Sequence, residues 1–282
     1  MSEGSEPLDP ALDLLVATLD LEELDRDIFR GTTPPTPLQR VFGGQVAGQA
    51  LVAAQRTVTD RAVHSLHAYF LRPGATDRPI IYQVDRIRDG RSFTTRRVVA
   101  IQNGKAIFNL QASFQVVEDG YDHQPPLPPD LPPPDSLPKW RFWANRPVDE
   151  AKPPPWLPFD LRLAGSGGGF DRLLWIRTVG RLADDPMLHR CVAAYASDLT
   201  LLQVTIPGVA HPEPDLPAAN PTFLASLDHG MWFHRPFRVD EWLLYAQSWA
   251  SSSSGRGLAE GRLFCADGRL AVSVLQEGVV RL

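Results

Sequence analysis

The chain has 282 residues, of which 43% are hydrophobic and 22% are charged, and its formal net charge is −5. This length predicts about two domains or one large one, and the apolar content is sufficient for a buried core, which excludes a chain disordered throughout. The acidic balance argues against nucleic acid or an anionic membrane as the main partner, and two cysteines are too few for a disulfide framework or a cysteine-rich zinc site.

The N-terminal segment MSEGSEPLDPALDLLVATLDLEELD is acidic, whereas a signal peptide begins with a basic stretch. No apolar run reaches the length of a membrane-spanning helix, and the final letters VVRL match no short targeting signal. We therefore expect a cytoplasmic protein without membrane insertion.

The first predicted central helix covers residues 43–58, with the sequence GGQVAGQALVAAQRTV. It is apolar nearly all round, so it should be deeply buried, and Gly44 and Gly48 would allow close packing. Strands rich in β-branched and aromatic residues follow it, and Asn103-Gly104 indicates a tight hairpin. This part of the chain therefore predicts one buried helix followed by an antiparallel sheet.

Proline is concentrated in one segment, where 13 of the 27 prolines lie between Pro125 and Pro158. Because proline is excluded from helix interiors and central strands, we predict a semi-rigid connector over residues 118–160. A docking site for a partner is the alternative interpretation of such a tract. Aromatic residues favour packing of the connector on the protein surface: Trp140, Phe142, Trp143 and Trp156.

The second half of the chain repeats the first. LHAYFLRP from Leu66 matches HGMWFHRP from His229 at an offset of 163, and Asp267-Gly268 matches the earlier hairpin at 164. A second central helix is predicted over residues 186–204, where apolar residues recur at helical spacing. Strands follow this helix as they follow the first.

One buried helix followed by an antiparallel sheet, twice over, predicts an α+β fold in which a curled sheet wraps each helix. The predicted division is a first repeat over residues 10–117, the connector over 118–160 and a second repeat over 161–282. Because a duplicated fold keeps its core in both copies, a polar residue on the core face of only one copy needs another explanation.

Three residues of the second copy meet this criterion. Asp198 lies at the margin of the apolar stripe of the second helix and aligns with Val52, or with Leu51 if the register slips. A carboxylate there is unfavourable unless it is paired or hydrogen-bonded. Gln276 ends a row of core-facing residues on the last strand. Ser226 stands at the start of a strand and aligns with Val63.

Each of the three has a structural alternative. Asp198 could cap a turn or pair with an arginine such as Arg190, Gln276 could satisfy a backbone group, and Ser226 could be structural. Together, however, a carboxylate, a hydroxyl and an amide can hold a water molecule and take its proton. No serine lies in a G-x-S-x-G motif, so direct attack by water on an activated acyl carbon is favoured over a serine nucleophile.

Other candidate residues are less persuasive. His64 and His67 would point to opposite faces of a strand, which argues against a metal site. Asp228 and His229 also face opposite ways when extended, which argues against an acid–base pair. The glycines of 165–169 lack the lysine of a phosphate-binding loop and no clear strand precedes them, so we interpret this segment as a flexible loop.

Several motifs resemble the acyl-CoA thioesterase II family, the bacterial TesB type and its peroxisomal relatives: RVFGGQVAGQAL, VHSLHAYFLRPG, DGRSFTTRRVVAIQNGK, AYASDL, SLDHGMWFHRPF and LQEGVVR. The resemblance covers residues 10–282 apart from the connector. It implies a double hotdog fold and hydrolysis of fatty acyl-CoA to free acid and coenzyme A, with no metal or organic cofactor. The family's catalytic aspartate, hydroxyl residue and glutamine match Asp198, Ser226 and Gln276. Serine stands at 226 where many bacterial members carry threonine, as it does in peroxisomal-type members.

The resemblance implies that Asp198, with Ser226 and Gln276, deprotonates the attacking water. Free N–H groups at the start of the first central helix make Gly43 and Gly44 candidate donors to the developing oxyanion. We expect the acyl chain in an apolar groove between the two repeats. We also expect a homo-oligomer, because hotdog sheets often pair. Two alternatives remain open: an enoyl-CoA hydratase and a non-catalytic acyl-CoA binding protein.

Overall fold

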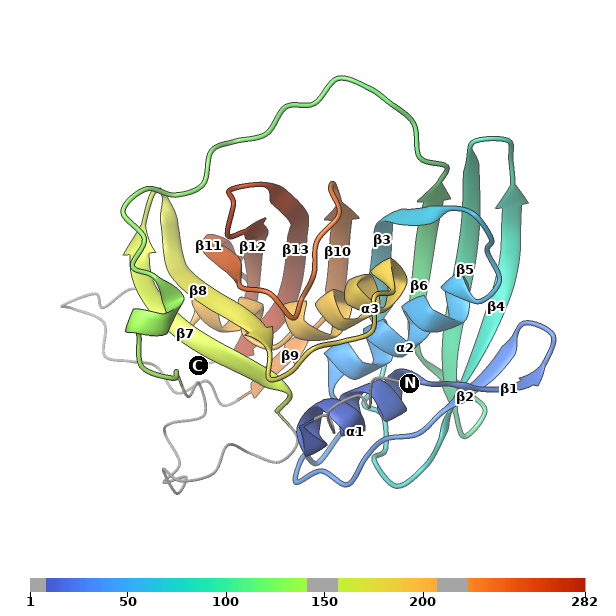
Figure 1. Ribbon diagram of the computed structural model, residues 1–282. Coiled ribbons are helices and arrows are strands. Elements are labelled where there is room, and N and C mark those ends of the chain that lie inside the picture. The colour runs from blue at the N-terminus through green and yellow to red at the C-terminus, as the bar shows by residue number, and fades with distance from the viewer. Residues whose placement is uncertain (1–8, 141–156, 207–222, 282) are drawn as a thin grey trace, which may run out of the picture.

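The computed structural model describes residues 9–140, 157–206 and 223–281. In the first repeat, a short helix and a strand pair precede the central helix, and four strands follow it (Figure 1). These elements are α1 (Pro10–Leu19), β1 (Glu22–Asp25), β2 (Ile28–Gly31), α2 (Gly43–Gln55), β3 (Ala62–Phe70), β4 (Ile80–Asp89), β5 (Phe93–Gln102) and β6 (Lys105–Gln115).

The second repeat again places a strand pair before its central helix. Its elements are β7 (Phe159–Gly167), β8 (Phe170–Thr178), α3 (Pro186–Ser197), β9 (Phe223–Ser226), β10 (Asp228–Phe233), β11 (Leu243–Ser253), β12 (Arg256–Cys265) and β13 (Leu270–Arg281). Helix α3 starts where it does because the Asp185 side chain accepts a hydrogen bond from the backbone N–H of Met187, with Pro186 in the first turn.

The strands form one antiparallel sheet in the order β1-β2-β4-β5-β6-β3-β10-β13-β12-β11-β8-β7, and β9 pairs with β13 off this path. The two repeats meet where β3 pairs with β10, and His67 lies opposite Gly230 there. These residues are 163 positions apart (230 − 67), which is the offset of the sequence repeat. A pseudo-twofold axis therefore passes between them, as in a symmetric dimer whose two subunits have been joined.

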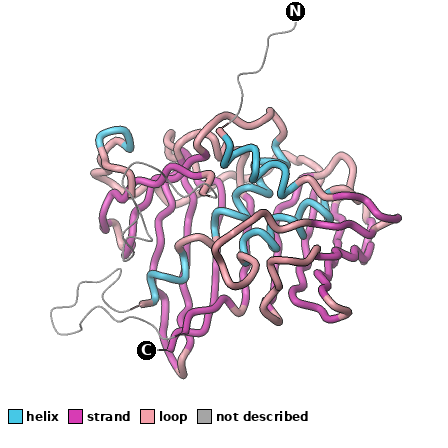
Figure 2. The backbone as a smooth tube through the Cα atoms, turned by 90° about the horizontal axis from the view of Figure 1, so that it is seen from below, coloured by secondary structure: helices cyan, strands magenta, loops and turns pink. Residues whose placement is uncertain are grey.

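Helices α2 and α3 pack against each other inside the curled sheet (Figure 2). A Cβ atom added at Gly44 would lie 2.2 Å from the carbonyl oxygen of Tyr195, and one added at Gly48 would lie 3.2 Å from that of Cys191. The close packing predicted at these two glycines is therefore confirmed, as is the α+β arrangement. None of the helices within the described residues is long and apolar enough to span a bilayer.

Both central helices are shorter than predicted. Helix α2 ends at Gln55 rather than at residue 58, and α3 ends at Ser197 rather than at residue 204. Beyond Ser197 the chain turns and continues as a 3-10 segment, Leu201–Thr205. The helix predicted over 186–204 was too long. Buried apolar residues of the 3-10 segment continue the helical spacing of α3, so the pattern did not show where the helix ends. Asp198 consequently caps the end of α3 instead of lying on its flank.

The strand pairs before the central helices were not predicted. The interpretation of residues 165–169 as a loop without a preceding strand was wrong, because residues 165–167 belong to β7 and residues 168–169 form the turn of the β7–β8 hairpin. Glycine suits this turn, since Gly168 and Gly169 both have positive φ. The tight hairpins predicted at Asn103-Gly104 and Asp267-Gly268 are confirmed.

The described part of the proline-rich connector, residues 118–140, crosses from β6 to the far half of the sheet (Figure 1). Its leucines pack on the sheet face that points away from α3, and Pro132 accepts a hydrogen bond of 3.1 Å from the indole of Trp175. The surface course predicted for the connector holds over these residues. Phe142, Trp143 and Trp156 lie outside the described residues, and the division into segments 10–117, 118–160 and 161–282 stays a prediction.

Candidate active site

Asp198 lies at the C-terminal end of α3, where the helix gives way to a turn. Ser226 is the last residue of β9, and Gln276 lies in β13. The two strands pair so that Ser226 is opposite Gly278, two residues beyond Gln276. The three predicted site residues are therefore brought together by one helix end and two neighbouring strands.

The side chains of these residues, called the polar trio below, form a closed set of hydrogen bonds. The Gln276 amide nitrogen donates to the Asp198 carboxylate oxygen Oδ1 at 2.5 Å, and Ser226 Oγ donates to the same oxygen at 3.1 Å. The Gln276 amide also lies 2.8 Å from Ser226 Oγ. Gln276 is fully buried, whereas Asp198 and Ser226 keep part of their surface accessible.

The protonation of Asp198 is set by competing effects. Loss of hydration is the largest and raises the pKa of its carboxyl from 3.8 to about 6. Hydrogen bonds from Gln276, Ser226 and the Gly44 backbone oppose this rise, as does the positive charge of Arg40. Asp198 is thus a stronger base than an exposed aspartate and is still mostly ionised at neutral pH.

The start of α2 contacts this carboxylate directly. The Gly44 backbone N–H donates a hydrogen bond to it, as expected for the free N–H groups at a helix start. A Cβ atom added at Gly43 would lie 2.6 Å from Asp198 Oδ2. Both glycines predicted as oxyanion donors therefore lie beside the polar trio, with the Gly44 N–H directed to the carboxylate.

An apolar cavity of about 50 Å³ lies next to the polar trio, between the two repeats. Tyr195 and Leu199, which flank Asp198 in sequence, form part of its wall, and the Tyr195 ring packs edge-on against Phe42 at 5.1 Å between centroids. The residues around the cavity are Thr33, Pro34, Thr36, Leu38, Phe42, Gln45, Leu157, Tyr195 and Leu199. A small apolar space is thus available beside the carboxylate.

The structure bears on two of the alternative pairings considered for these residues, Asp198 with Arg190 and Asp228 with His229. The Arg190 guanidinium contacts the Met187 sulfur rather than Asp198. His229 is buried, its Nε2 lies 2.8 Å from Ser197 Oγ, and burial lowers the pKa of its imidazole to about 4.

Asp228 instead accepts a hydrogen bond from the Glu277 backbone, so it does not form an acid–base pair with His229. His64 bonds to Ser113, and no cluster of three metal-ligating side chains occurs within the described ranges.

Sequence reasoning missed two features of the site. Gly44 contacts Asp198 across the pair of central helices, and Arg40, just before α2, lies close enough to influence the Asp198 carboxyl. The motif RVFGGQ, which contains Arg40 and both glycines, was the available signal. Its link to Asp198 could not be predicted because the two segments are far apart in the chain.

Comparisons with known proteins give a consistent result. Residues 151–279 match the family model described as acyl-CoA thioesterase, and residues 32–115 match the model described as acyl-CoA thioesterase N-terminal domain. The chain is 42% identical to acyl-coenzyme A thioesterase 8 of Mus musculus, over 95% of this chain and 89% of that protein.

The chain is also 37% identical to acyl-CoA thioesterase 2 of Haemophilus influenzae, over 96% of this chain and 98% of that protein. Among solved structures, the acyl-CoA thioesterase II TesB2 of Mycobacterium marinum is 44% identical with a TM-score of 0.78. This alignment covers 95% of this chain and 98% of the other.

Proposed function

The chain belongs to the acyl-CoA thioesterase family, has the double hotdog fold and is a thioester hydrolase; from this premise we propose that it hydrolyses fatty acyl-CoA by direct attack of water activated by Asp198, Ser226 and Gln276. The observation that carries the proposal is the polar trio itself. Burial raises the pKa of its carboxylate to about 6, and both the serine hydroxyl and the glutamine amide donate hydrogen bonds to it.

In the proposed reaction, Asp198 is the general base. It takes a proton from a water molecule that the Ser226 hydroxyl and the Gln276 amide help to hold, and the water oxygen bonds to the thioester carbon. Collapse of the tetrahedral intermediate breaks the carbon–sulfur bond. The coenzyme A thiolate leaves, and the proton held by Asp198 returns to the products.

The negative charge on the thioester oxygen needs a hydrogen-bond donor during this attack. Gly43 and Gly44 at the start of α2 are proposed for this role, because the helix start places free N–H groups and a partial positive charge beside the trio. The Gly44 N–H bonds to Asp198. When Asp198 becomes protonated, this N–H would donate to the oxyanion instead. The carboxylate and the intermediate would therefore not compete for the same donor.

The acyl chain is proposed to enter the apolar cavity between the repeats. The cavity wall includes Tyr195 and Leu199, on either side of Asp198, and Phe42, next to Gly43. A volume of about 50 Å³ accommodates only a short piece of a chain.

Two measurements test this function. Thiol release is followed across acyl-CoA chain lengths, and addition of water to an enoyl-CoA is followed in parallel. The proposal predicts thiol release without hydration of the double bond. Hydration alone would favour the hydratase alternative, and tight binding without either reaction would favour the binding-protein alternative.

Direct attack also predicts that no acyl-enzyme accumulates. In a rapid-mixing experiment, thiol should appear without an initial burst. A burst equal to the enzyme concentration would indicate a covalent intermediate and contradict the water mechanism.

The proposal includes a cytoplasmic homo-oligomer. Support comes from the open edges of the sheet, which ends in β1 and β7 and could pair with another copy. Light scattering of the purified protein measures the mass in solution, and a mass of a single chain would contradict assembly.

A further inference from the structure

The two strands that carry Ser226 and Gln276 continue to an edge that bears positive charge. Phe223, at the start of β9, pairs with Arg281, at the end of β13. Ser226 follows Phe223 by three residues, so the edge lies roughly 10 Å from the catalytic hydroxyl at the usual rise of a strand. Phe223 and Arg281 lie three and five residues from Ser226 and Gln276, so their side chains point to the opposite face of the two strands from the polar trio.

A second arginine reaches the same place from the first repeat. The Arg40 guanidinium carbon lies 5.6 Å from the centroid of the Phe223 ring, and that of Arg281 lies 5.9 Å from it. Arg40 also donates a hydrogen bond of 2.7 Å to the Leu224 carbonyl. Phe223 is 45% exposed, and both arginines are exposed. Two guanidinium groups thus gather around one accessible ring.

The acidic residue nearest to this edge on β13 is engaged elsewhere. The Glu277 carboxylate is paired with Arg256 at 2.9 Å. Within residues 9–140, 157–206 and 223–281, no carboxylate forms an ion pair with Arg40. A guanidinium has five N–H donors, so the bond to Leu224 leaves most of the Arg40 donors for another partner.

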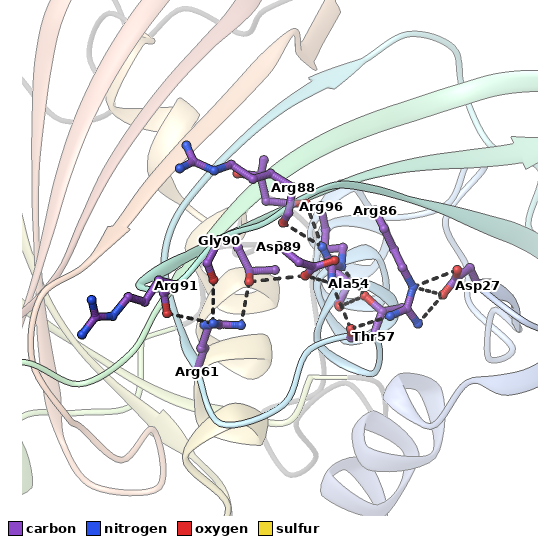
Figure 3. Close-up of polar contacts among 12 residues, drawn as sticks. Asp27, Ala54, Thr57, Arg61, Arg86, Arg88, Asp89, Gly90, Arg91 and Arg96 are labelled. Atoms are coloured by element: carbon purple, nitrogen blue, oxygen red, sulfur yellow. Dashed lines mark hydrogen bonds and ion pairs between the residues drawn. The ribbon is translucent and has the colours of Figure 1, made fainter.

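A larger group of arginines lies around the β4–β5 hairpin, but most of them form hydrogen bonds or ion pairs with nearby residues of the protein (Figure 3). Arg96 pairs with Asp89 at 2.6 Å, and Arg61 donates to the carbonyls of Gly90 and Arg91. Arg86 pairs with Asp27 in the same way. The bonds from Arg61 hold the hairpin to the chain that follows α2, which is the end of that helix opposite to Gly43.

Only Arg88 and Arg91 of that group extend their side chains away from the bonded network in Figure 3. They provide the rival location for an anion site and also suitable control positions. Their distance from the start of α2 is that of a 13-residue helix, about 20 Å at the usual rise per residue.

We propose that Arg40 and Arg281, held around Phe223, bind the phosphate groups at the nucleotide end of coenzyme A. This inference rests on the proposed function, since it places the far end of the same substrate. Guanidinium groups suit phosphate because their planar N–H donors match pairs of phosphate oxygens. The thioester would lie at the polar trio, and the connecting pantetheine arm would pass around β9, which among the described strands pairs only with β13, to the face that carries Phe223 and Arg281.

The test compares two thioesters of the same acyl group. One carries coenzyme A, and the other carries pantetheine, which lacks the nucleotide and its phosphates. The variants are Arg40→Ala and Arg281→Ala, with Arg88→Ala as the matched control from the rival group. We expect KM for acyl-CoA to rise about five- to tenfold in each site variant, as for loss of an exposed charge-assisted hydrogen bond. In Arg281→Ala, the kinetics with acyl-pantetheine should stay within about twofold. Arg40→Ala also removes a charge that lowers the pKa of Asp198, so for this variant the informative quantity is the additional loss on acyl-CoA relative to acyl-pantetheine.

The outcomes separate binding from structural damage. An equal loss on both thioesters would mean that the arginines only support the site and would overturn the proposal. A rise in KM for acyl-CoA in Arg88→Ala, without one in Arg281→Ala, would place the phosphates at the β4–β5 hairpin and would also overturn it.

The proposed function can fail separately. If the unmodified protein releases thiol from neither thioester, hydrolysis is contradicted, and the phosphate site is then judged by calorimetric titration with free coenzyme A. Weaker binding to Arg281→Ala than to Arg88→Ala would support the site. Equal binding to both variants would overturn it.

Discussion

The side-chain amide of Gln276 donates a hydrogen bond of 2.5 Å to the carboxylate of Asp198, joining residues 78 positions apart in the chain. Gln276 is fully buried within β13, and its own Oε1 has no hydrogen-bond partner in the described part of the chain. A buried amide with an unused acceptor is unfavourable unless the site needs it. That acceptor could receive a hydrogen from a bound water.

Replacing Gln276 by alanine should therefore reduce kcat by about 10- to 100-fold, because the base loses a donor and the water loses a partner. The same loss should raise the pKa of Asp198, since this hydrogen bond lowers it. The acid limb of the activity profile would move to higher pH. Gln83, an exposed glutamine on β4, provides the control Gln83→Ala. Equal activity in both variants would refute a role for Gln276.

The pH dependence of the unmodified enzyme is a second prediction. Because Asp198 must be ionised to act as a base and burial raises its pKa to about 6, kcat/KM should fall below that pH. The fall should approach tenfold per pH unit. Initial rates from pH 4 to 8 measure it. A profile that is flat down to pH 4 would contradict a base with a raised pKa.

Stability should show the opposite dependence on Asp198. Its pKa is higher in the folded state, so its favourable contribution is complete below pH 3.8 and is lost as pH rises through about 6. Asparagine does not titrate, so the Asp198→Asn variant does not lose this contribution to stability as pH rises. As pH rises from 4 to 8, the free energy of unfolding of the variant should increase relative to that of the unmodified protein by up to about 3 kcal/mol.

Urea unfolding of both proteins at several pH values gives this difference directly. The size of the gap at one pH also includes changes in hydrogen bonding, so its slope with pH is the informative quantity. A gap that stays constant from pH 4 to 8 would mean that burial does not perturb the carboxyl.

The glycines at the start of α2 give a fourth prediction. A Cβ atom at Gly43 would lie 2.6 Å from Asp198 Oδ2 and 2.8 Å from the Phe70 ring, so Gly43→Ala should displace the carboxylate. We expect kcat to fall by about 100-fold, as for loss of a correctly placed catalytic group. Gly120→Ala is the control, since no atom lies within 4 Å of its added Cβ. Undiminished kcat in the Gly43 variant would contradict the contact.

Much of the architecture could be predicted from the sequence because the chain contains two copies of one fold, which can be compared with each other. Comparison of the copies selected Asp198, Ser226 and Gln276, and the structure brings these side chains into mutual contact. Hydrophobic spacing likewise predicted both central helices. These successes share a cause, since buried faces impose regular spacing along the chain.

The missed features have physical reasons of their own. Strand β1 is exposed at all four residues, so it has no alternating pattern to detect. Helix α3 stops at Ser197, although apolar residues continue at helical spacing, because the chain turns at Asp198. The bond from Gly44 to Asp198 depends on how two helices pack, and no local pattern encodes such a contact.

Thiol release by the Asp198→Asn variant tests the central claim most directly. The side chain keeps its size and loses only its basicity, so circular dichroism and thermal unfolding should show a folded protein. The proposed mechanism predicts that kcat/KM for acyl-CoA falls by at least about 100-fold relative to the unmodified enzyme, the usual contribution of a general base. Near-native turnover in the folded variant would contradict it.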